Sequence, residues 1–375
     1  MHLYLHIPFC RQACHYCDFH FSTQLDGRNA LVDALARELI LQQAYLSRQP
    51  LQTIYFGGGT PSLLTEAELA RLMDTIHRCF SVQPNAEITL EANPDDLTNE
   101  KLAQINALGI NRLSIGIQSF DEANLRYLNR IHTATEGENC VRQAQEAGIE
   151  NISIDLIYAI GPAPDHRIWE RDLEKAIALN VPHLSAYCLT IEPQTVFGNW
   201  LKRRKIQPID DEFAAGQFER LTRHLAGAGY EHYEISNFAQ PGRYSRHNTS
   251  YWRQEPYLGV GPSAHSFDGA TTRQANVSNN ARYVATLGRG EIPAETEHLS
   301  ERDRVNEYLL TSLRTQWGCD LVKLKTISEE GHSRIRSFTP PLLEKGWLND
   351  EAGTLRLTPA GKLFADRVAS ELFWV

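Results

Sequence analysis

Short apolar segments alternate with amphipathic ones along the first half of this 375-residue chain. Runs rich in aromatic and β-branched residues predict strands at 2–7, 53–56, 87–91, 112–117, 151–157 and 183–187. Between them, apolar residues recur at helical spacing and predict helices near 30–46, 66–80, 99–108 and 169–179, and in the stretch up to 145. Strands and helices that alternate at this pitch form parallel βα units, so we expect an α/β fold.

Polar groups gather where the predicted strands end. A cysteine-containing loop follows the first strand and a glycine run follows the second, while Glu91, Gln118 and Asp155 lie at or near the ends of the next three. The carboxyl ends of parallel strands meet at one rim, where α/β folds place their sites. The spacing alone fits an open sheet as well as a barrel. The shared rim leads us to favour a partial (β/α)6 barrel.

The alternating pattern ends near residue 193. We expect the partial barrel to span 1–195 and an extension of it to span 196–315, with helices near 211–228, 280–287 and 301–314. Strands are predicted at 231–235 and around 259–267. Residues 316–375 read as two helices, two short strands and a final helix. This order predicts a smaller C-terminal α+β, winged-helix-like module.

Composition narrows the range of partners and compartments. The formal net charge is −9 and no long basic run is present, so we do not expect nucleic acid as a partner. The first residues lack the features of a signal peptide. No apolar run approaches the roughly 20 residues of a transmembrane helix, which leaves only peripheral contact with a membrane open. The seven cysteines form no disulfide pattern and indicate a cytoplasmic protein.

Three cysteines, Cys10, Cys14 and Cys17, fall within eight residues in a C-x3-C-x2-C pattern. Thiolates are soft ligands, and three of them on one loop can hold a metal centre. Three ligands suit an iron–sulfur cluster with one open iron. A zinc site is the alternative, and it requires a fourth ligand such as His15 or His20.

The second predicted strand is followed by Gly57-Gly58-Gly59-Thr60-Pro61. Glycines allow a ligand to approach bare backbone, although the run also fits a plain strand-to-helix turn. No Lys-Ser/Thr pair follows it, which excludes a P-loop.

The cysteine pattern resembles the signature of the radical S-adenosylmethionine (SAM) superfamily. Resemblance to the oxygen-independent coproporphyrinogen III oxidase family within it extends over most of the chain. It is carried by Tyr-Leu-His-Ile-Pro-Phe-Cys, Gly-Gly-Gly-Thr-Pro-Ser, Glu-Ala-Asn-Pro, Ser-Ile-Gly-Ile-Gln-Ser-Phe, Leu-Asn-Arg-Ile-His and Asp-Leu-Ile-Tyr.

The resemblance implies cofactors and site residues. Cys10, Cys14 and Cys17 would hold a [4Fe–4S] cluster whose fourth iron binds SAM, and an electron donor would reduce the cluster. The residues that would contact this SAM are Tyr4, Gly58, Gly59, Thr60 and Glu91. In the oxidases, the counterparts of four further residues contact a second SAM, and here these are Tyr16, Gln118, Arg130 and Asp155.

Two departures from the oxidases match the heme-chaperone branch of the family. Phe19 stands where the oxidases have a fourth cysteine, and we expect this protein to lack the N-terminal extension that the oxidases carry before their cysteine motif. That branch also has a heme-binding motif of the pattern His247-Asn248-x-x-Tyr251-Trp252. If helical, the segment places His247 and Tyr251 on one face, and both side-chain types can ligate heme iron. A loop histidine beside a buried tyrosine is the plainer interpretation.

We therefore expect a protein that binds a [4Fe–4S] cluster, SAM and heme and delivers heme to an acceptor protein. Two enzymatic alternatives stay open. One is the oxidative decarboxylation of coproporphyrinogen III, and the other is radical SAM chemistry on another substrate, such as methylation. The resemblance does not decide whether the protein is an enzyme.

Overall fold

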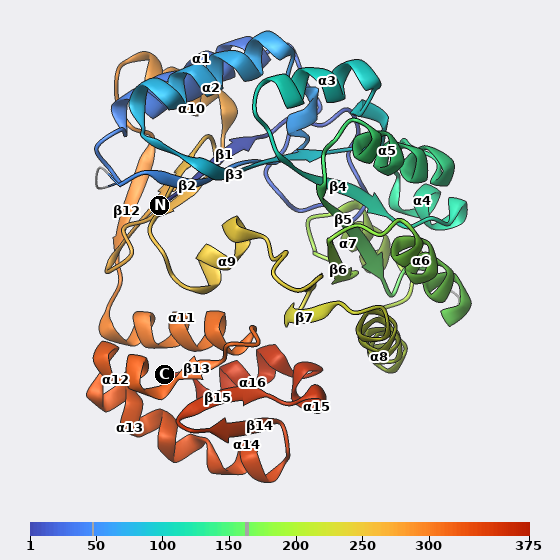
Figure 1. Cartoon of the computed structure of the whole chain (residues 1–375). Helices are drawn as coiled ribbons and strands as arrows, with labels where there is room; N and C mark the ends of the chain where they lie inside the picture. Colours follow the sequence, from blue (N-terminus) through green and yellow to red (C-terminus); the bar gives the residue numbers. More distant parts are fainter. Residues whose placement is uncertain (47–48, 162–164) are drawn as a thin grey trace.

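A computed structural model describes residues 1–46, 49–161 and 165–375 (Figure 1). Its main feature is a sheet of parallel strands in chain order, formed by β1 (His2–Ile7), β2 (Leu51–Gly58), β3 (Val82–Ala92), β4 (Arg112–Gln118), β5 (Asn151–Tyr158) and β6 (His183–Cys188). The helices that connect them are α1 (Arg28–Leu41), α2 (Glu66–Cys79), α3 (Asn99–Ala107), α4 (Glu122–Leu128), α5 (Ala134–Glu146) and α6 (His166–Ala178). The sheet does not close, which confirms the predicted partial barrel.

The strands of this sheet have one apolar and one polar face. In β1, Leu3 and Leu5 are fully buried in the hydrophobic core that the sheet shares with the helices. Because side chains alternate along a strand, Tyr4 and His6 point to the opposite face. The same alternation holds in the neighbouring strands and produces a polar inner face, lined by His2, Tyr4, His6, Thr53, Tyr55, Glu87, Thr89, Glu91, Arg112, Ser114, Asp155, His183 and Ser185.

The chain beyond β6 extends the sheet at both edges. It passes through α7 (Val196–Lys202) and α8 (Asp211–Gly227), and then β7 (Glu231–Glu234) and β8 (Asn237–Ala239) add antiparallel strands beside β6. At the other edge β9 (Tyr257–Val260) runs parallel to β1. Three antiparallel strands follow it, namely β10 (His265–Phe267), β11 (Thr272–Asn276) and β12 (Ala294–His298). Helix α10 (Asn280–Gly288) lies beside α1.

A short helix, α9 (Arg246–Trp252), lies on the inner side of the sheet (Figure 1). It contacts β2 on one side and α11 (Glu301–Leu313) on the other. Ser245 caps its first turn by accepting a hydrogen bond from the Asn248 backbone. The Glu87 carboxylate on β3 accepts the backbone N–H groups of Arg246 and His247 at 3.2 and 3.0 Å. The His247 segment is therefore helical and is fixed to β3.

The C-terminal region has a hydrophobic core of its own. Its small antiparallel sheet has the order β13 (Cys319–Asp320), β15 (Thr354–Leu357), β14 (Leu348–Glu351). Its helices after α11 are α12 (Leu321–Ile327), α13 (Glu329–Phe338), α14 (Pro340–Glu344), α15 (Pro359–Lys362) and α16 (Ala365–Leu372). Helix α11 contributes Val305, Leu309 and Leu313 to this core, so the unit includes a helix that the sequence analysis assigned to the preceding extension. No helix in the described ranges is long and apolar enough to cross a membrane.

Candidate functional site

The three clustered cysteines lie on the loop between β1 and α1, and all three are half-buried free thiols. Backbone hydrogen bonds fix this loop at two points. The Cys10 N–H donates to Ser22 O at 3.0 Å, and the His15 N–H donates to Leu128 O at 3.1 Å. These bonds hold the thiols at the carboxyl end of β1.

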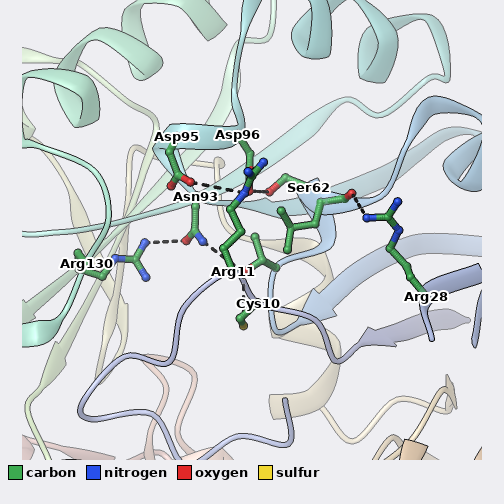
Figure 2. A network of polar contacts seen from close by, with 10 residues as sticks. Cys10, Arg11, Arg28, Ser62, Asn93, Asp95, Asp96 and Arg130 are labelled. Carbon is green, nitrogen blue, oxygen red and sulfur yellow. Dashed lines mark hydrogen bonds and ion pairs between the residues drawn. The ribbon is translucent and has the colours of Figure 1, made fainter. Parts of the chain in front are cut away.

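A continuous chain of hydrogen bonds joins two of the thiols, and Figure 2 shows its part from Cys10 to Arg130. The Thr60 hydroxyl donates to Cys10 Sγ at 3.5 Å and accepts from Asn93 Nδ2 at 3.2 Å. Asn93 Oδ1 accepts from Arg130 Nη2 at 2.6 Å, and Arg130 Nη1 donates to Cys14 Sγ at 3.4 Å. Donors directed at sulfur stabilise the negative charge of a thiolate-bound cluster.

An ion pair at the same edge fastens the loop to the turn after β3. Arg11 donates to Asp96 Oδ1 at 2.7 Å, and Ser62 donates to Asp96 Oδ2 at 2.8 Å (Figure 2). Asp96 belongs to the short helix η2 (Pro94–Asp96), and Ser62 belongs to η1 (Pro61–Leu63). The turns after β1, β2 and β3 are thereby held together around the cysteine loop.

A side chain on the glycine run would meet atoms of β1 and of the cysteine loop. Gly58 has φ +112°, and a Cβ there would lie 2.7 Å from the His6 ring. At Gly59 a Cβ would lie 2.7 Å from Phe9 O and 3.0 Å from Cys10 Sγ. Gly58 is therefore required beside His6 of β1, and Gly59 is required because the start of the cysteine loop packs directly on its backbone.

Glu91 lies at the centre of the first group of expected SAM residues. Its carboxylate accepts from the Tyr55 hydroxyl at 2.8 Å and from the Gly58 N–H at 3.0 Å. Desolvation raises the pKa of Glu91 to about 7, although both hydrogen bonds oppose the rise. Tyr4 lies close enough that the Glu91 charge adds to the desolvation that raises the Tyr4 pKa. The structure thus brings Tyr4, Gly58, Gly59, Thr60 and Glu91 together beside Cys10.

The second group surrounds Arg130. Arg130 Nη2 donates to Gly116 O at 2.8 Å, and a Cβ on Gly116 would lie 2.7 Å from Gln118 Nε2. Gln118 itself has φ +68°. Desolvation raises the pKa of Tyr16, and the neighbouring Cys14 thiol adds to the rise. Tyr16, Gln118 and Arg130 therefore gather beside Cys14.

Asp155 lies deeper on the inner face than these residues. Ser114 Oγ donates to its carboxylate at 3.2 Å. Desolvation raises the pKa of Asp155, and its hydrogen bonds with Ser185 and Ser114 oppose the rise. Asp155 is thus a largely desolvated carboxyl of the inner face, held by the hydroxyl groups of two serines.

The donors around the thiols fit a cuboidal iron–sulfur cluster. Such a cluster binds its three cysteine sulfurs to three different irons, so the sulfurs need not converge on one point. In the described part of the chain, no three His, Cys, Asp or Glu side chains are close enough to hold a single metal ion. Thr60 is a neutral donor to the Cys10 sulfur, and Arg130 is a cationic donor to the Cys14 sulfur.

His247 is 1% exposed and occupies the inner face beside β2. Its Nδ1 is 2.6 Å from Thr53 Oγ1, and its Nε2 is 2.8 Å from the Tyr251 hydroxyl. Its ring stacks on Tyr55, with centroids 4.9 Å apart. The pair His247–Tyr251 therefore shares one face of α9, as the spacing predicted. Both ring nitrogens of His247 are engaged within the protein.

Sequence reasoning missed three residues of the site. Asn93 links the two sulfur donors, but an asparagine that precedes a proline reads as a turn residue. Tyr55 joins Glu91 to His247, but an aromatic residue in a strand reads as core. Arg112 is 1% exposed on the inner face, and its Nη1 has no hydrogen-bond partner among the described residues. An arginine at the start of a buried strand is the signal that could have identified it.

The fold and the cysteine loop define a radical SAM protein. The model of the radical SAM superfamily matches residues 4–171. A solved structure of coproporphyrinogen III oxidase (HemN) from Escherichia coli superposes with a TM-score of 0.84, at 22% identity, over 99% of this chain and 89% of that one. This likeness shows the fold. Membership in the superfamily implies a [4Fe–4S] cluster and SAM.

Relatives of higher identity define the family more narrowly. The heme chaperone HemW of Bacillus subtilis is 34% identical over 372 residues, which cover 97% of each chain. The protein of the same name from Escherichia coli K12 is also 34% identical, over 99% of this chain and 97% of its own. The chain belongs to the HemW family of radical SAM proteins.

Proposed function

We propose that this protein is a heme chaperone that binds heme and passes it to an acceptor protein. The observation that carries the proposal is the His247–Tyr251 pair on α9, which lies against Tyr55 of the strand that leads into the glycine run. The name of the full-length relatives gives the same function.

The cluster end of the site has defined roles in this proposal. Cys10, Cys14 and Cys17 hold a [4Fe–4S] cluster, which supplies an electron for reductive cleavage of SAM when it is bound. The residues that contact the SAM are Tyr4, Gly58, Gly59, Thr60 and Glu91. Among them, the Glu91 carboxylate attracts the positive charge of SAM. A second ligand would bind on the side of the site nearer Cys14. The residues that would contact it are Tyr16, Gln118, Arg130 and Asp155.

The heme end requires a rearrangement of α9. His247 is buried, and its Nε2 is occupied by the Tyr251 hydroxyl. Heme iron can bind Nε2 only when that hydroxyl leaves and α9 moves away from the inner face. The Arg314 guanidinium lies 5.5 Å from the centre of the Trp252 ring and packs the end of α9 against the C-terminal unit. Movement of α9 would therefore involve this unit as well.

In this proposal the protein delivers heme to an acceptor protein, receives electrons for its cluster from an electron donor, and acts in the cytoplasm. All seven cysteines are free thiols, and a reducing compartment preserves such thiols. The names of the relatives identify no acceptor, so the first assay of heme release uses a general heme scavenger such as an apoglobin.

The test is an anaerobic heme titration of the reconstituted protein, followed by visible absorbance. Wild type should bind heme near one equivalent, and His247→Ala should weaken binding by at least tenfold. His265→Ala is the matched control, because His265 is an exposed histidine on β10 outside α9. Absence of binding in wild type would remove the chaperone function. Equal binding by His247→Ala would place heme elsewhere.

A second assay separates the chaperone from the oxidase. The reduced protein with SAM is incubated with coproporphyrinogen III, and porphyrin products are measured after oxidation. A chaperone should yield no protoporphyrin above the level given by Cys14→Ala. Sustained formation of protoporphyrinogen by wild type would contradict the proposal.

A further inference from the structure

A short basic turn follows α7 beside the cysteine loop. Its four residues are Lys202, Arg203, Arg204 and Lys205, and all four are exposed. None of them forms an ion pair with a described acidic side chain. They are the longest run of consecutive basic residues in a chain whose formal net charge is −9. Neither the core of the fold nor the proposed heme site uses this charge.

The backbone of the basic turn is fixed by hydrogen bonds. The Arg204 N–H donates to Leu201 O at 2.9 Å, and the Lys205 N–H donates to Trp200 O at 2.8 Å, which is the Schellman pattern of a helix end. Arg204 has φ +55°, in the left-handed position where glycine is the usual residue. The end of a helix does not require an arginine there. The turn therefore presents its charges from a defined conformation.

Helix α7 fastens the basic turn to the cysteine loop. The Phe197 N–H donates to His15 O at 3.0 Å. The ring of His15, the residue after Cys14, lies against the Trp200 ring with centroids 4.8 Å apart. Trp200 is also the residue whose carbonyl accepts from Lys205. A direct series of contacts thus joins the turn to the loop that carries the thiols.

The charge of the turn selects the kind of partner that can approach the cysteine loop. The formal net charge of −9 repels a second acidic protein from most of the surface. A group of exposed cations attracts such a protein locally, and complementary charges raise the rate of encounter and orient the partner. In the proposed function the cluster receives electrons. The turn therefore lies where an acidic electron carrier would have to approach.

We propose that the basic turn is the docking surface for an acidic one-electron carrier protein that reduces the cluster. The inference rests on the proposed function, to which it adds the position and the charge of the electron donor's binding site. The carrier holds a low-potential flavin or iron–sulfur centre. In each encounter that centre is oxidised by one electron, and the [4Fe–4S] cluster gains the electron and passes from its oxidised to its reduced state. No bond forms between the two proteins.

The first measurement is the affinity for a plant-type [2Fe–2S] ferredoxin, an acidic carrier used as the probe. Isothermal titration calorimetry with oxidised ferredoxin is run on the full chain before and after cluster reconstitution. Arg203→Glu/Arg204→Glu reverses the two central charges of the turn and should weaken binding by about tenfold or more. The difference should shrink as salt is added, because the Debye length falls to about 3 Å at 1 M salt.

The second measurement is the rate of cluster reduction. Stopped-flow absorbance follows the reconstituted protein after it is mixed with photoreduced ferredoxin. Arg203→Glu/Arg204→Glu should lower the second-order rate constant by about tenfold or more at low salt. Photoreduced deazaflavin is a small reductant that needs no docking surface, so it should reduce the variant at the wild-type rate.

Two further variants separate the position of the charge from its amount. Arg243→Glu/Arg302→Glu makes the same change in net charge at exposed arginines outside the basic turn, and its affinity and rate should stay near those of wild type. Lys202→Gln/Lys205→Gln neutralises the outer charges of the turn and should weaken binding by less than the double reversal does. Iron content and circular dichroism report whether each variant is loaded and folded.

Three outcomes would overturn the docking surface. They are wild-type affinity and rate in Arg203→Glu/Arg204→Glu, an equal loss in Arg243→Glu/Arg302→Glu, and no binding of ferredoxin by wild type. A fourth concerns vesicles of phosphatidylglycerol and phosphatidylcholine. If the double reversal abolishes vesicle binding but leaves ferredoxin binding unchanged, the turn binds a membrane and the proposal is wrong.

Heme titration distinguishes failure of this inference from failure of the proposed function. Wild-type protein that binds heme but shows no dependence of reduction on the basic turn keeps the chaperone function and loses the docking surface. Protein that binds no heme, yet is reduced more slowly in Arg203→Glu/Arg204→Glu alone, keeps the docking surface and loses the chaperone function.

Discussion

The ring of His247 stacks on the ring of Tyr55, with centroids 4.9 Å apart and an angle of 30° between the planes. The Tyr55 hydroxyl donates to Glu91, the carboxylate placed among the SAM residues. One tyrosine of β2 therefore touches both the proposed heme ligand and the proposed SAM ligand. A change at either end can reach the other through this single side chain.

The first prediction concerns the hydroxyl of Tyr55. Tyr55→Phe removes the hydrogen bond to Glu91 but keeps the stack on His247. A hydrogen bond to a charged group contributes about 1.5 kcal/mol or more, so SAM affinity should fall about tenfold while heme affinity stays unchanged. Equilibrium dialysis with labelled SAM and the heme titration measure the two effects.

Two further variants test whether the two halves of Tyr55 act separately. Tyr55→Leu removes the hydroxyl and the ring, and should weaken both ligands. Tyr45→Phe is the control, because the Tyr45 hydroxyl is buried and has no hydrogen-bond partner among the described residues. Equal loss of SAM and heme affinity in Tyr55→Phe would show that the hydroxyl does not act on Glu91 alone.

The second prediction is a pH dependence of SAM binding. Glu91 has a pKa of about 7, raised by desolvation, and only its ionised form attracts the positive charge of SAM. SAM affinity should therefore rise as the pH increases, by about tenfold between about pH 6 and pH 8, and then level off. Isothermal titration calorimetry across this range measures the profile.

Glu91→Gln provides the check on this assignment. Its SAM affinity should be low and nearly independent of pH. Tyr55→Phe should move the midpoint of the profile upward, because the hydrogen bond from Tyr55 lowers the Glu91 pKa in wild type. A wild-type profile retained in Glu91→Gln would assign the titration to another group.

Much of the fold follows from local sequence patterns. The strands from β1 to β6 and the helices between them were predictable, because each carries its own periodicity and the order of the strands repeats the order in the chain. The rim was predictable for the same reason. Cys10, Glu91 and Gln118 each follow or end a strand, and parallel strands bring these ends together.

Contacts between distant segments could not be predicted in this way. Thr53 and His247 are 194 positions apart, and no local pattern announces that α9 returns to the inner face of β2. Strand β9 pairs with β1, although its four residues carry little signal of their own. Strands β11 and β12 are largely polar and partly exposed, so neither alternation nor an apolar run marks them.

The third prediction concerns the hydrogen-bond chain between two thiols. Asn93→Leu removes the amide that holds Thr60 and Arg130 in place, so the donors to Cys10 and Cys14 weaken. Hydrogen bonds to sulfur stabilise the reduced cluster, and their loss should lower the cluster potential, by on the order of 50 mV. A redox titration followed by electron paramagnetic resonance measures it.

The control for this variant is Asn106→Leu, at an exposed asparagine of α3. It should leave the potential unchanged. If Asn93→Leu also keeps the wild-type potential with a full cluster, the donors to the two sulfurs do not depend on Asn93. Loss of the cluster altogether would assign Asn93 a structural role in place of a tuning one.

The last prediction tests the contact between the glycine run and the cysteine loop. In Gly59→Ala, the new Cβ would lie 2.7 Å from Phe9 O and 3.0 Å from Cys10 Sγ, so backbone or sulfur must move. The loop should shift, and the cluster assembled under anaerobic reconstitution should fall well below that of wild type, as read from visible absorbance and iron content. Gly27→Ala is the matched control, because Gly27 precedes α1 and a Cβ there meets nothing within 4 Å.

Thermal unfolding of the cluster-free proteins shows whether the fold itself survives. If Gly59→Ala keeps the melting temperature of Gly27→Ala but loses the cluster, the glycine serves the placement of Cys10. If it assembles a full cluster, the loop has room that these distances deny, and the packing argument for Gly59 is wrong.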